Sequence, residues 1–261
     1  MNRQQNRHRI GQASWGLAFL LLRASRAEAG SFSVNPVRVT LSASQTVAAI
    51  TVRNEGTEAT VVQLETQSWT QRDGVDVLTQ SNDVLATPPI LTIPPGGTRI
   101  VRVGLRRTPD AQREVTYRLF LREVPPPQAL AQALRVALLI SMPIFVVPSK
   151  ATAPQVQWRA ARTRDGQVRV EAHNGGTAHI QLGQLDVSLA ANGEKVATRN
   201  MSEYVLPDNQ RSWTVSAKSA PPAGTLLHIS SQTDTGTVQF DVKLEDDARE
   251  VSPAAANTAS R

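Results

Sequence analysis

The hydrophobic positions of this chain recur at every second residue along most of its length, which is the period of β-strands. In the segment 98–105, for example, Val101, Val103 and Leu105 fall on one face. Short runs of this kind alternate with turn signals from Ser31 onward, and no heptad repeat or amphipathic helix interrupts them. The pattern predicts an all-β protein of sandwich type.

About seven such segments precede Pro148. The main ones are 32–41, 45–54, 60–70, 75–78, 98–105, 115–124 and 133–148. Asp73-Gly74 is a strong signal for a hairpin turn between two of them. The first domain is therefore expected over residues 30–148.

After a polar linker at residues 149–154 the rhythm of strands and turns changes. A second, smaller β domain is expected over 155–245. Its predicted strands are 156–162, 167–172, 180–190, 195–200, 212–217, 226–231 and 238–244. Asn192-Gly193 is its strongest hairpin signal.

The most apolar stretch after the N-terminal region runs from Ala133 to Pro148. As a strand it is apolar on both faces, which is typical of the middle of a buried sheet. Pro143 opposes that position, because proline cannot donate to a ladder and is confined to edges, strand starts or bulges. Two interpretations remain open: a core strand with a kink, or an edge strand that recruits another chain.

The two ends of the chain are set aside from the fold. Residues 1–29 combine a basic start, an apolar core of ten residues and the small-x-small site Ala27-Glu28-Ala29, which predicts a secretory signal peptide. Residues 246–261 are polar and alanine-rich and are expected to be disordered. The whole chain has a net charge of +6, but residues 30–261 keep only 23 basic and 21 acidic residues. Nucleic-acid binding is therefore not expected.

Catalytic and metal-binding motifs are missing from the sequence. There is no cysteine, nucleophile elbow, zinc motif or phosphate-binding loop. His173 and His179 flank a glycine-rich turn, but two imidazoles without a third ligand make a poor metal site, so surface positions are expected for them. We expect neither an enzyme nor a cofactor.

Several segments, taken in order, resemble one known family. They are Asn35-Pro36-Val37-Arg38-Val39, Ala86-Thr87-Pro88-Pro89, Ile93-Pro94-Pro95-Gly96, Tyr117 to Pro125, and Ile144 to Pro148. Together they are similar to the periplasmic pilus-assembly chaperones, the PapD-like family. The resemblance covers roughly residues 31–150. It implies two immunoglobulin-like β-sandwich domains at an angle, with a cleft between them.

The resemblance also implies donor-strand complementation, in which the chaperone lends an edge strand to a pilus subunit that lacks one. The strand would be the stretch after Ala133. Its side chains expected to fill the subunit groove are Leu134, Val136, Leu138, Ile140 and Met142.

Two basic residues of the family anchor the subunit's terminal carboxylate. The resemblance places the first at Arg38. The family's second anchor, a lysine, falls at Pro143 here, and Arg118 is the candidate substitute, expected near Ile140. The proline and the short preceding loop look like the branch of these chaperones that serves spore-coat-like pili.

The resemblance implies a location in the periplasm. The implied partners are pilus or fimbrial subunits and an outer-membrane usher, and the protein is not expected to be embedded in a membrane. The main alternative is a secreted β-sandwich that is itself a structural or adhesive subunit. An extracytoplasmic enzyme is the other alternative, and no motif supports it.

Overall fold

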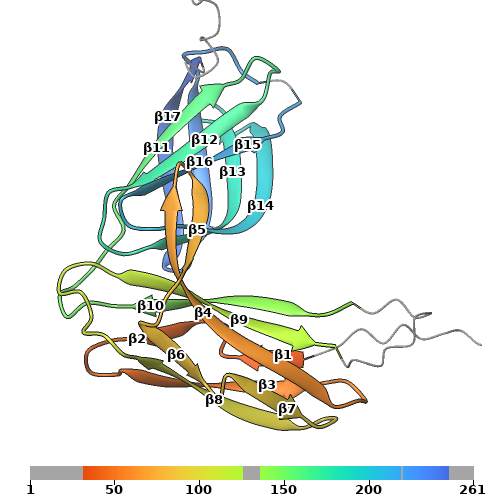
Figure 1. Cartoon of the computed structure of the whole chain (residues 1–261). Coiled ribbons are helices and arrows are strands. Elements are labelled where there is room, and N and C mark those ends of the chain that lie inside the picture. Colours follow the sequence, from red (N-terminus) through yellow and green to blue (C-terminus); the bar gives the residue numbers. More distant parts are fainter. Residues whose placement is uncertain (1–31, 126–135, 219, 247–261) are drawn as a thin grey trace, which may run out of the picture.

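The computed structural model of the chain describes residues 32–125, 136–218 and 220–246, and every regular element in these ranges is a β-strand (Figure 1). Strands β1 to β10 form one domain, and β11 to β17 form a second domain set at an angle to it. The predicted all-β class with two sandwich domains is confirmed. The predicted signal peptide lies outside the described residues. So does the predicted tail, except that Asp246 ends the last strand.

Two sheets make up the first domain. The first consists of β1 (Phe32–Asn35), β3 (Val47–Asn54), β8 (Thr98–Leu105) and β6 (Val84–Thr87) in that order. The second consists of β2 (Val39–Leu41), β10 (Leu139–Val146), β9 (Val115–Val124), β4 (Thr60–Arg72) and β5 (Val75–Gln80), with β7 (Ile90–Ile93) paired to β4. Alternate residues of both sheets fill the core between them; Val103 and Leu119, for instance, are fully buried.

The second domain is a continuous sheet that folds over its own core. Its strand order is β14 (Lys195–Val205), β13 (Ile180–Leu189), β16 (Leu226–Thr233), β17 (Gly236–Asp246), β11 (Val156–Arg162), β12 (Val168–Asn174) and β15 (Asn209–Val215). Residues from both halves, such as Val170 and Leu227, share one core.

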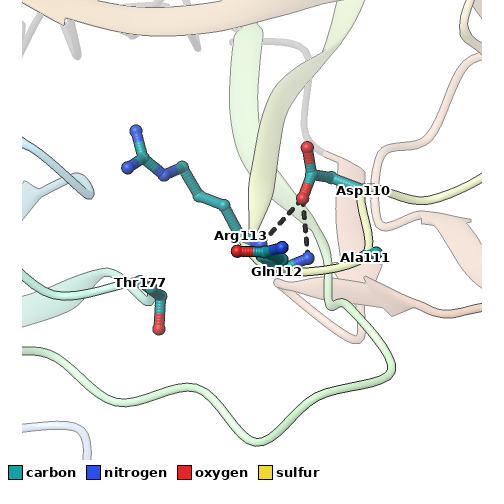
Figure 2. Close-up of a pocket in the computed structure, with 5 residues that line it drawn as sticks. All are labelled: Asp110, Ala111, Gln112, Arg113 and Thr177. Carbon is teal, nitrogen blue, oxygen red and sulfur yellow. Dashed lines mark hydrogen bonds between the residues drawn. The ribbon is translucent and has the colours of Figure 1, made fainter.

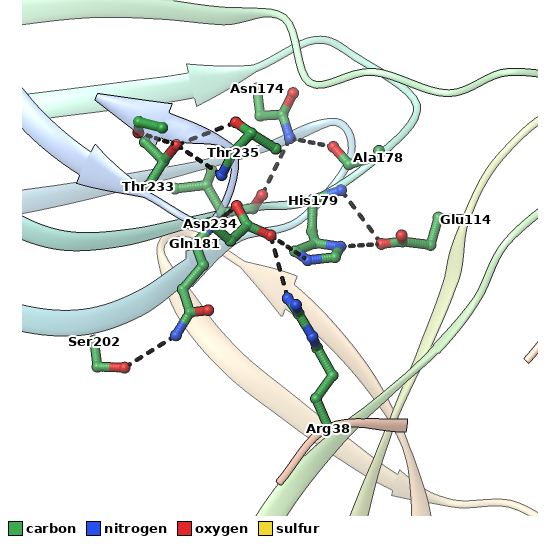
Figure 3. Close-up of polar contacts among 12 residues, drawn as sticks. Arg38, Glu114, Asn174, Ala178, His179, Gln181, Ser202, Thr233, Asp234 and Thr235 are labelled. Carbon is green, nitrogen blue, oxygen red and sulfur yellow. Dashed lines mark hydrogen bonds and ion pairs between the residues drawn. The ribbon is translucent and has the colours of Figure 1, made fainter. Parts of the chain in front are cut away.

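The first predicted strand, 32–41, is two strands in the structure. β1 belongs to the first sheet and β2 to the second, and the chain bends between them at residues 36–38. The apolar alternation changes phase at this break, from Phe32 and Val34 to Val37, Val39 and Leu41, and the prediction of a single strand overlooked that shift. The bend places Arg38 directly before β2, at the side of the domain that faces the second domain (Figure 3).

The hairpin of β4 and β5 reaches beyond its own sheet toward the second domain (Figure 1). Its tip is the predicted Asp73-Gly74 turn, in which both residues have positive φ, 51° and 79°. The side chain of Gln71 donates to the carbonyl of Tyr204 at 2.8 Å and accepts from the N–H of Leu206 at 3.0 Å. Because these bonds are buried, the hairpin fixes one domain against the other.

An apolar cluster lies at the junction of the two domains. Trp69 and Phe145 come from the first domain, and Tyr204 and Leu206 come from the second. The rings of Trp69 and Tyr204 meet edge to face with centroids 5.4 Å apart. This cluster packs the junction beneath the candidate site described next.

A buried asparagine holds a turn in each domain. Asn54 donates to the carbonyls of Glu58 and Ile93 and accepts the N–H of Gly56. Asn174 likewise donates to the carbonyls of Ala178 and Val205 and accepts the N–H of Gly176. The second of these turns leads into His179 and fixes its position at the junction.

Candidate functional site: a basic row at the end of a free strand edge

Two arginines lie on either side of Pro143. In the ladder between β10 and β9, Pro143 pairs with Arg118. In the parallel ladder between β10 and β2, Ile144 pairs with Val39, so Arg38 stands one residue before that pair, next to Pro143. Arg38, Pro143 and Arg118 therefore form one row across three strands, here called the basic row.

Arg118 was expected near Ile140, but the structure places it opposite Pro143, three residues further along β10. In the structure Leu121 is opposite Ile140. An odd shift moves every side chain of a strand to the other face of the sheet. Only the observed register puts Leu121 in the core together with the inner face of β10, and it brings Arg118 to the position of the missing lysine.

Arg38 is oriented by a carboxylate from the second domain. Its Nη1 donates to Oδ2 of Asp234 at 3.2 Å, and Asp234 lies in the turn between β16 and β17 (Figure 3). The imidazole of His179, whose Nε2 lies 3.5 Å from Oδ2 of Asp234, lowers the pKa of Asp234, against an opposing effect of burial. Asp234 is thus held in its charged form beside Arg38.

Arg118 lies with its guanidinium over the ring of Trp69, 3.7 Å from the ring centre. It forms no hydrogen bond or ion pair with any residue that the structure describes. Burial lowers its pKa from the ordinary value, and the charge of Asp76 opposes that effect. Arg118 is therefore a partly desolvated cation whose hydrogen-bonding groups are not used within the described chain.

Arg38 and Arg118 both act electrostatically on the hydroxyl of Tyr204. Burial raises the pKa of its hydroxyl, whereas the charges of Arg38 and Arg118 both lower it. Both guanidinium groups are therefore close enough to Tyr204 to act on it electrostatically. A carboxylate near this hydroxyl would meet two cations in a partly dry environment.

His179 lies between two carboxylates, and the prediction that it is a surface residue was wrong. Its Nδ1 is 2.7 Å from Oε1 of Glu114 in the first domain, and its Nε2 is 3.5 Å from Oδ2 of Asp234. The imidazole stacks on Phe145 with ring centres 3.6 Å apart. The flanking glycines suggested an exposed turn, but the turn held by Asn174 folds back to the junction. His173 is exposed, as expected.

Within the residues that the structure describes, the strand β10 has a free edge along its first half. It pairs with β9 over its whole length, but it pairs with β2 only from Ile144 to Val146. The N–H of Glu123 donates to the carbonyl of Leu138, and the alternation of an antiparallel ladder then turns the polar groups of Leu139 and Ser141 away from β9. Among the described residues β10 is therefore an edge strand over its first half, and Pro143 is tolerated because its missing N–H would have faced outward. That this edge recruits another chain stays a prediction.

The five predicted groove-filling side chains are not equally available. Leu134 lies outside the described residues, and Val136 is 60% exposed. Leu138 and Ile140 are partly buried against the core of their own domain. Met142 contradicts the prediction: it is 2% exposed, because it faces Leu119 inside the sandwich. The strand itself begins at Leu139 rather than Ala133.

The described residues offer no catalytic arrangement at this junction. A hollow of about 490 Å³ lies beside it, lined by residues 110–113 and Thr177 (Figure 2). In that hollow the Asp110 carboxylate accepts the N–H groups of Gln112 and Arg113, which lowers its pKa. No group of three metal-ligating side chains occurs within 32–125, 136–218 and 220–246. These same ranges contain no helix long and apolar enough to cross a membrane.

Comparison with known proteins identifies the first domain. The family "Pili and flagellar-assembly chaperone, PapD N-terminal domain" matches residues 31–152. The first domain belongs to the PapD family of chaperones. The chaperone protein PapD of Escherichia coli is 31% identical over 99 residues, which are 36% of this chain. That alignment spans 40% of PapD.

Solved structures of PapD-like chaperones share the fold of both domains. A chain of the CsuC–CsuE chaperone–tip adhesion subunit pre-assembly complex of Acinetobacter baumannii is 18% identical; 83% of this chain and 100% of that chain align, with a TM-score of 0.62. The E. coli chaperone DraB is 21% identical over 84% of this chain and 98% of its own, with a TM-score of 0.56. The expected pair of immunoglobulin-like sandwiches is thereby confirmed.

Proposed function

We propose that this protein is a periplasmic chaperone that stabilises pilus subunits by donor-strand complementation and delivers them to an outer-membrane usher. The observation that carries the proposal is the position of the basic row. It lies where the free edge of β10 ends and where β2 begins to pair. An added strand would bond to Leu139 and Ser141, and its last residue would reach Arg38 and Arg118.

The geometry sets the direction of the added strand. Its carboxyl end must lie at the basic row, and β10 itself runs toward that row. The subunit strand would therefore run parallel to β10, in line with β2. Val136, Leu138 and Ile140 would supply apolar surface near the start of the edge, and Leu134 stays a predicted member of this group. Each such side chain contributes roughly 1.5–3 kcal/mol when it is fully buried.

The charged end of the subunit suits the two guanidinium groups. An arginine binds a carboxylate through two parallel hydrogen bonds, and such bonds are about twice as strong as neutral ones. Arg38 uses Nη1 for Asp234, which leaves its Nε and Nη2 for the subunit. This role requires neither metal nor cofactor, and it is not catalytic.

Co-expression of the chaperone with a subunit encoded beside it tests the proposal. We expect a one-to-one complex in the periplasmic extract, and we expect Arg38→Ala to abolish it. Arg99→Ala is the matched control, because Arg99 is an exposed arginine on β8 in the other sheet. Equal recovery of the complex with Arg38→Ala would refute the anchor. Failure of the unmodified protein to retain any subunit would refute the chaperone function.

A further inference from the structure

The carboxylate anchor has a second layer that joins the two domains. Asp234 Oδ2 is shared by Arg38 Nη1 at 3.2 Å and His179 Nε2 at 3.5 Å, while its Oδ1 accepts the N–H of Gln181 at 3.3 Å (Figure 3). On the other side of the imidazole, Glu114 accepts from Nδ1 and from the N–H of His179. The side chains of His179 and Glu114 are only 11% and 3% exposed.

We propose that Asp234 and His179 are positioning residues of this anchor: Asp234 orients Arg38, and protonated His179 provides the charge that allows a second carboxylate to bind beside Asp234. The inference rests on the proposed function and deepens it. It makes binding of the subunit's carboxylate dependent on pH through one residue.

A balance of charges at the junction carries the inference. Arg38 and Arg118 bring two positive charges, and Asp234 and Glu114 bring two negative charges. With neutral His179 the site has no net charge, so an added carboxylate would leave one negative charge in excess. Protonated His179 removes that excess. Asp76, the other carboxylate acting on Arg118, already has Arg211 at 3.4 Å as its partner.

The surroundings of His179 favour its protonated form. Both ring nitrogens face carboxylates, and an imidazole can donate from both nitrogens only when it is protonated. The other groups packed against it are Phe145 from β10, which is uncharged, and the Tyr204 ring from β14 at 5.6 Å. Burial lowers the pKa of His179, but hydrogen bonds and charges from Asp234 and Glu114 outweigh it and raise the pKa above the ordinary value.

Two synthetic peptides are the probes for the test. They are acetylated heptapeptides of alternating valine and threonine, one with a free carboxylate and one with a terminal amide. Binding to the purified chaperone is followed by NMR of the arginine guanidinium and histidine ring signals from about pH 5.5 to about pH 8.5. The ratio of the two affinities isolates the contribution of the carboxylate.

We expect that ratio to fall at least about fivefold as the pH rises through the pKa of His179. His179→Gln should give a low ratio that does not change with pH, and His179→Lys should restore a high ratio at all pH values. Asp234→Asn removes one of the two negative charges and keeps an acceptor for Arg38, so the ratio should stay high and depend less on pH. Dispersed NMR spectra of each variant verify that the fold is intact.

Two results would overturn the inference. A preference for the free carboxylate that is constant across the pH range, or equally steep in His179→Gln, refutes the role of His179 but keeps the proposed anchor. No preference at any pH, or no shift of the Arg38 and Arg118 signals by either peptide, refutes the anchor together with the inference.

Discussion

At the scale of single residues, Arg118 has the most informative environment. It stacks on Trp69 at 3.7 Å and stands opposite Pro143 in the ladder. Its burial costs free energy that the charge of Asp76 offsets only in part, as expected of a group that binds a charged ligand.

Replacement of Arg118 by methionine tests this role. The methionine keeps most of the contact with Trp69 but removes the charge, so the fold should persist. Loss of hydrogen bonds to a carboxylate costs about 1.5–3 kcal/mol, and affinity for a subunit should fall roughly ten- to a hundredfold. Isothermal titration calorimetry with a peptide of the subunit's C-terminal strand measures this affinity.

Arg122→Met is the control for that substitution. Arg122 lies on the same face of β9 but pairs with Leu139, four residues away from the basic row. Its replacement should change the affinity little. An equal loss in both variants would mean that general positive charge, and not the row, binds the peptide.

The sequence predicted these residues unevenly. Arg38 was named as a candidate from a motif that resembles a family, and Arg118 was named from the expected pairing of its strand; that they bind a carboxylate stays a prediction. His179 and Asp234 were not found, since each meets its partners only when the two domains are assembled. No local pattern marks a histidine that packs on a phenylalanine from the other domain.

At the scale of elements, β10 shows which features of a strand the period of its apolar residues can predict and which it cannot. It predicted the apolar strand and, through Pro143, its place at an edge. It did not predict that β2 would cover the second half of that edge, or that Met142 would face Leu119 inside the sandwich. The change of sheet within the first predicted strand is marked only by a shift of the apolar positions from even to odd numbers between Val34 and Val37, and the prediction of one strand overlooked it.

Proline substitutions on β10 test which backbone groups are free. The N–H of Ser141 points away from β9, so Ser141→Pro should leave the free energy of unfolding within about 1 kcal/mol of the unmodified value. Subunit binding should fall, because an added strand loses a main-chain bond. Urea unfolding and pull-down of the subunit measure the two effects.

Ile140→Pro is the opposite case. Its N–H points to β9, so this variant should lose about 3 kcal/mol of stability. Equal destabilisation by the two prolines would contradict the assignment of the free edge.

The hairpin of β4 and β5 carries a further prediction. Gln71→Ala leaves the buried N–H of Leu206 without its partner, and it leaves the carbonyl of Tyr204 with only the 3.3 Å hydrogen bond from Arg211 Nη1. We expect a loss of about 1–3 kcal/mol in the free energy of unfolding, and a wider spread of interdomain angles by small-angle scattering. Thr79→Ala, at an exposed site of the same hairpin, should change neither.

At the scale of the whole molecule, the two domains are joined by groups whose charges depend on pH. The pKa of His179 is raised in the folded protein. Its contribution to stability should be fully present below the pKa of an unfolded histidine, about 6.5, and be lost as the pH rises through the folded value. Urea unfolding at several pH values should show this slope.

The slope should disappear in His179→Gln. His228→Gln is the matched control, because His228 lies beside Asp241 on the exposed side of the second domain. A slope that persists in His179→Gln would place its origin in another group.

The point at which β2 begins to pair with β10, at Ile144, limits how far an added strand can extend. An added strand could pair with the open edge of β10 only as far as Ser141 and Pro143, because β2 occupies the edge beyond them. A polypeptide that continues past this point would collide with Val39, whereas one that terminates there is met by two guanidinium groups. If a subunit strand binds along this edge as proposed, the start of β2 would favour chain termini over internal segments of the same composition.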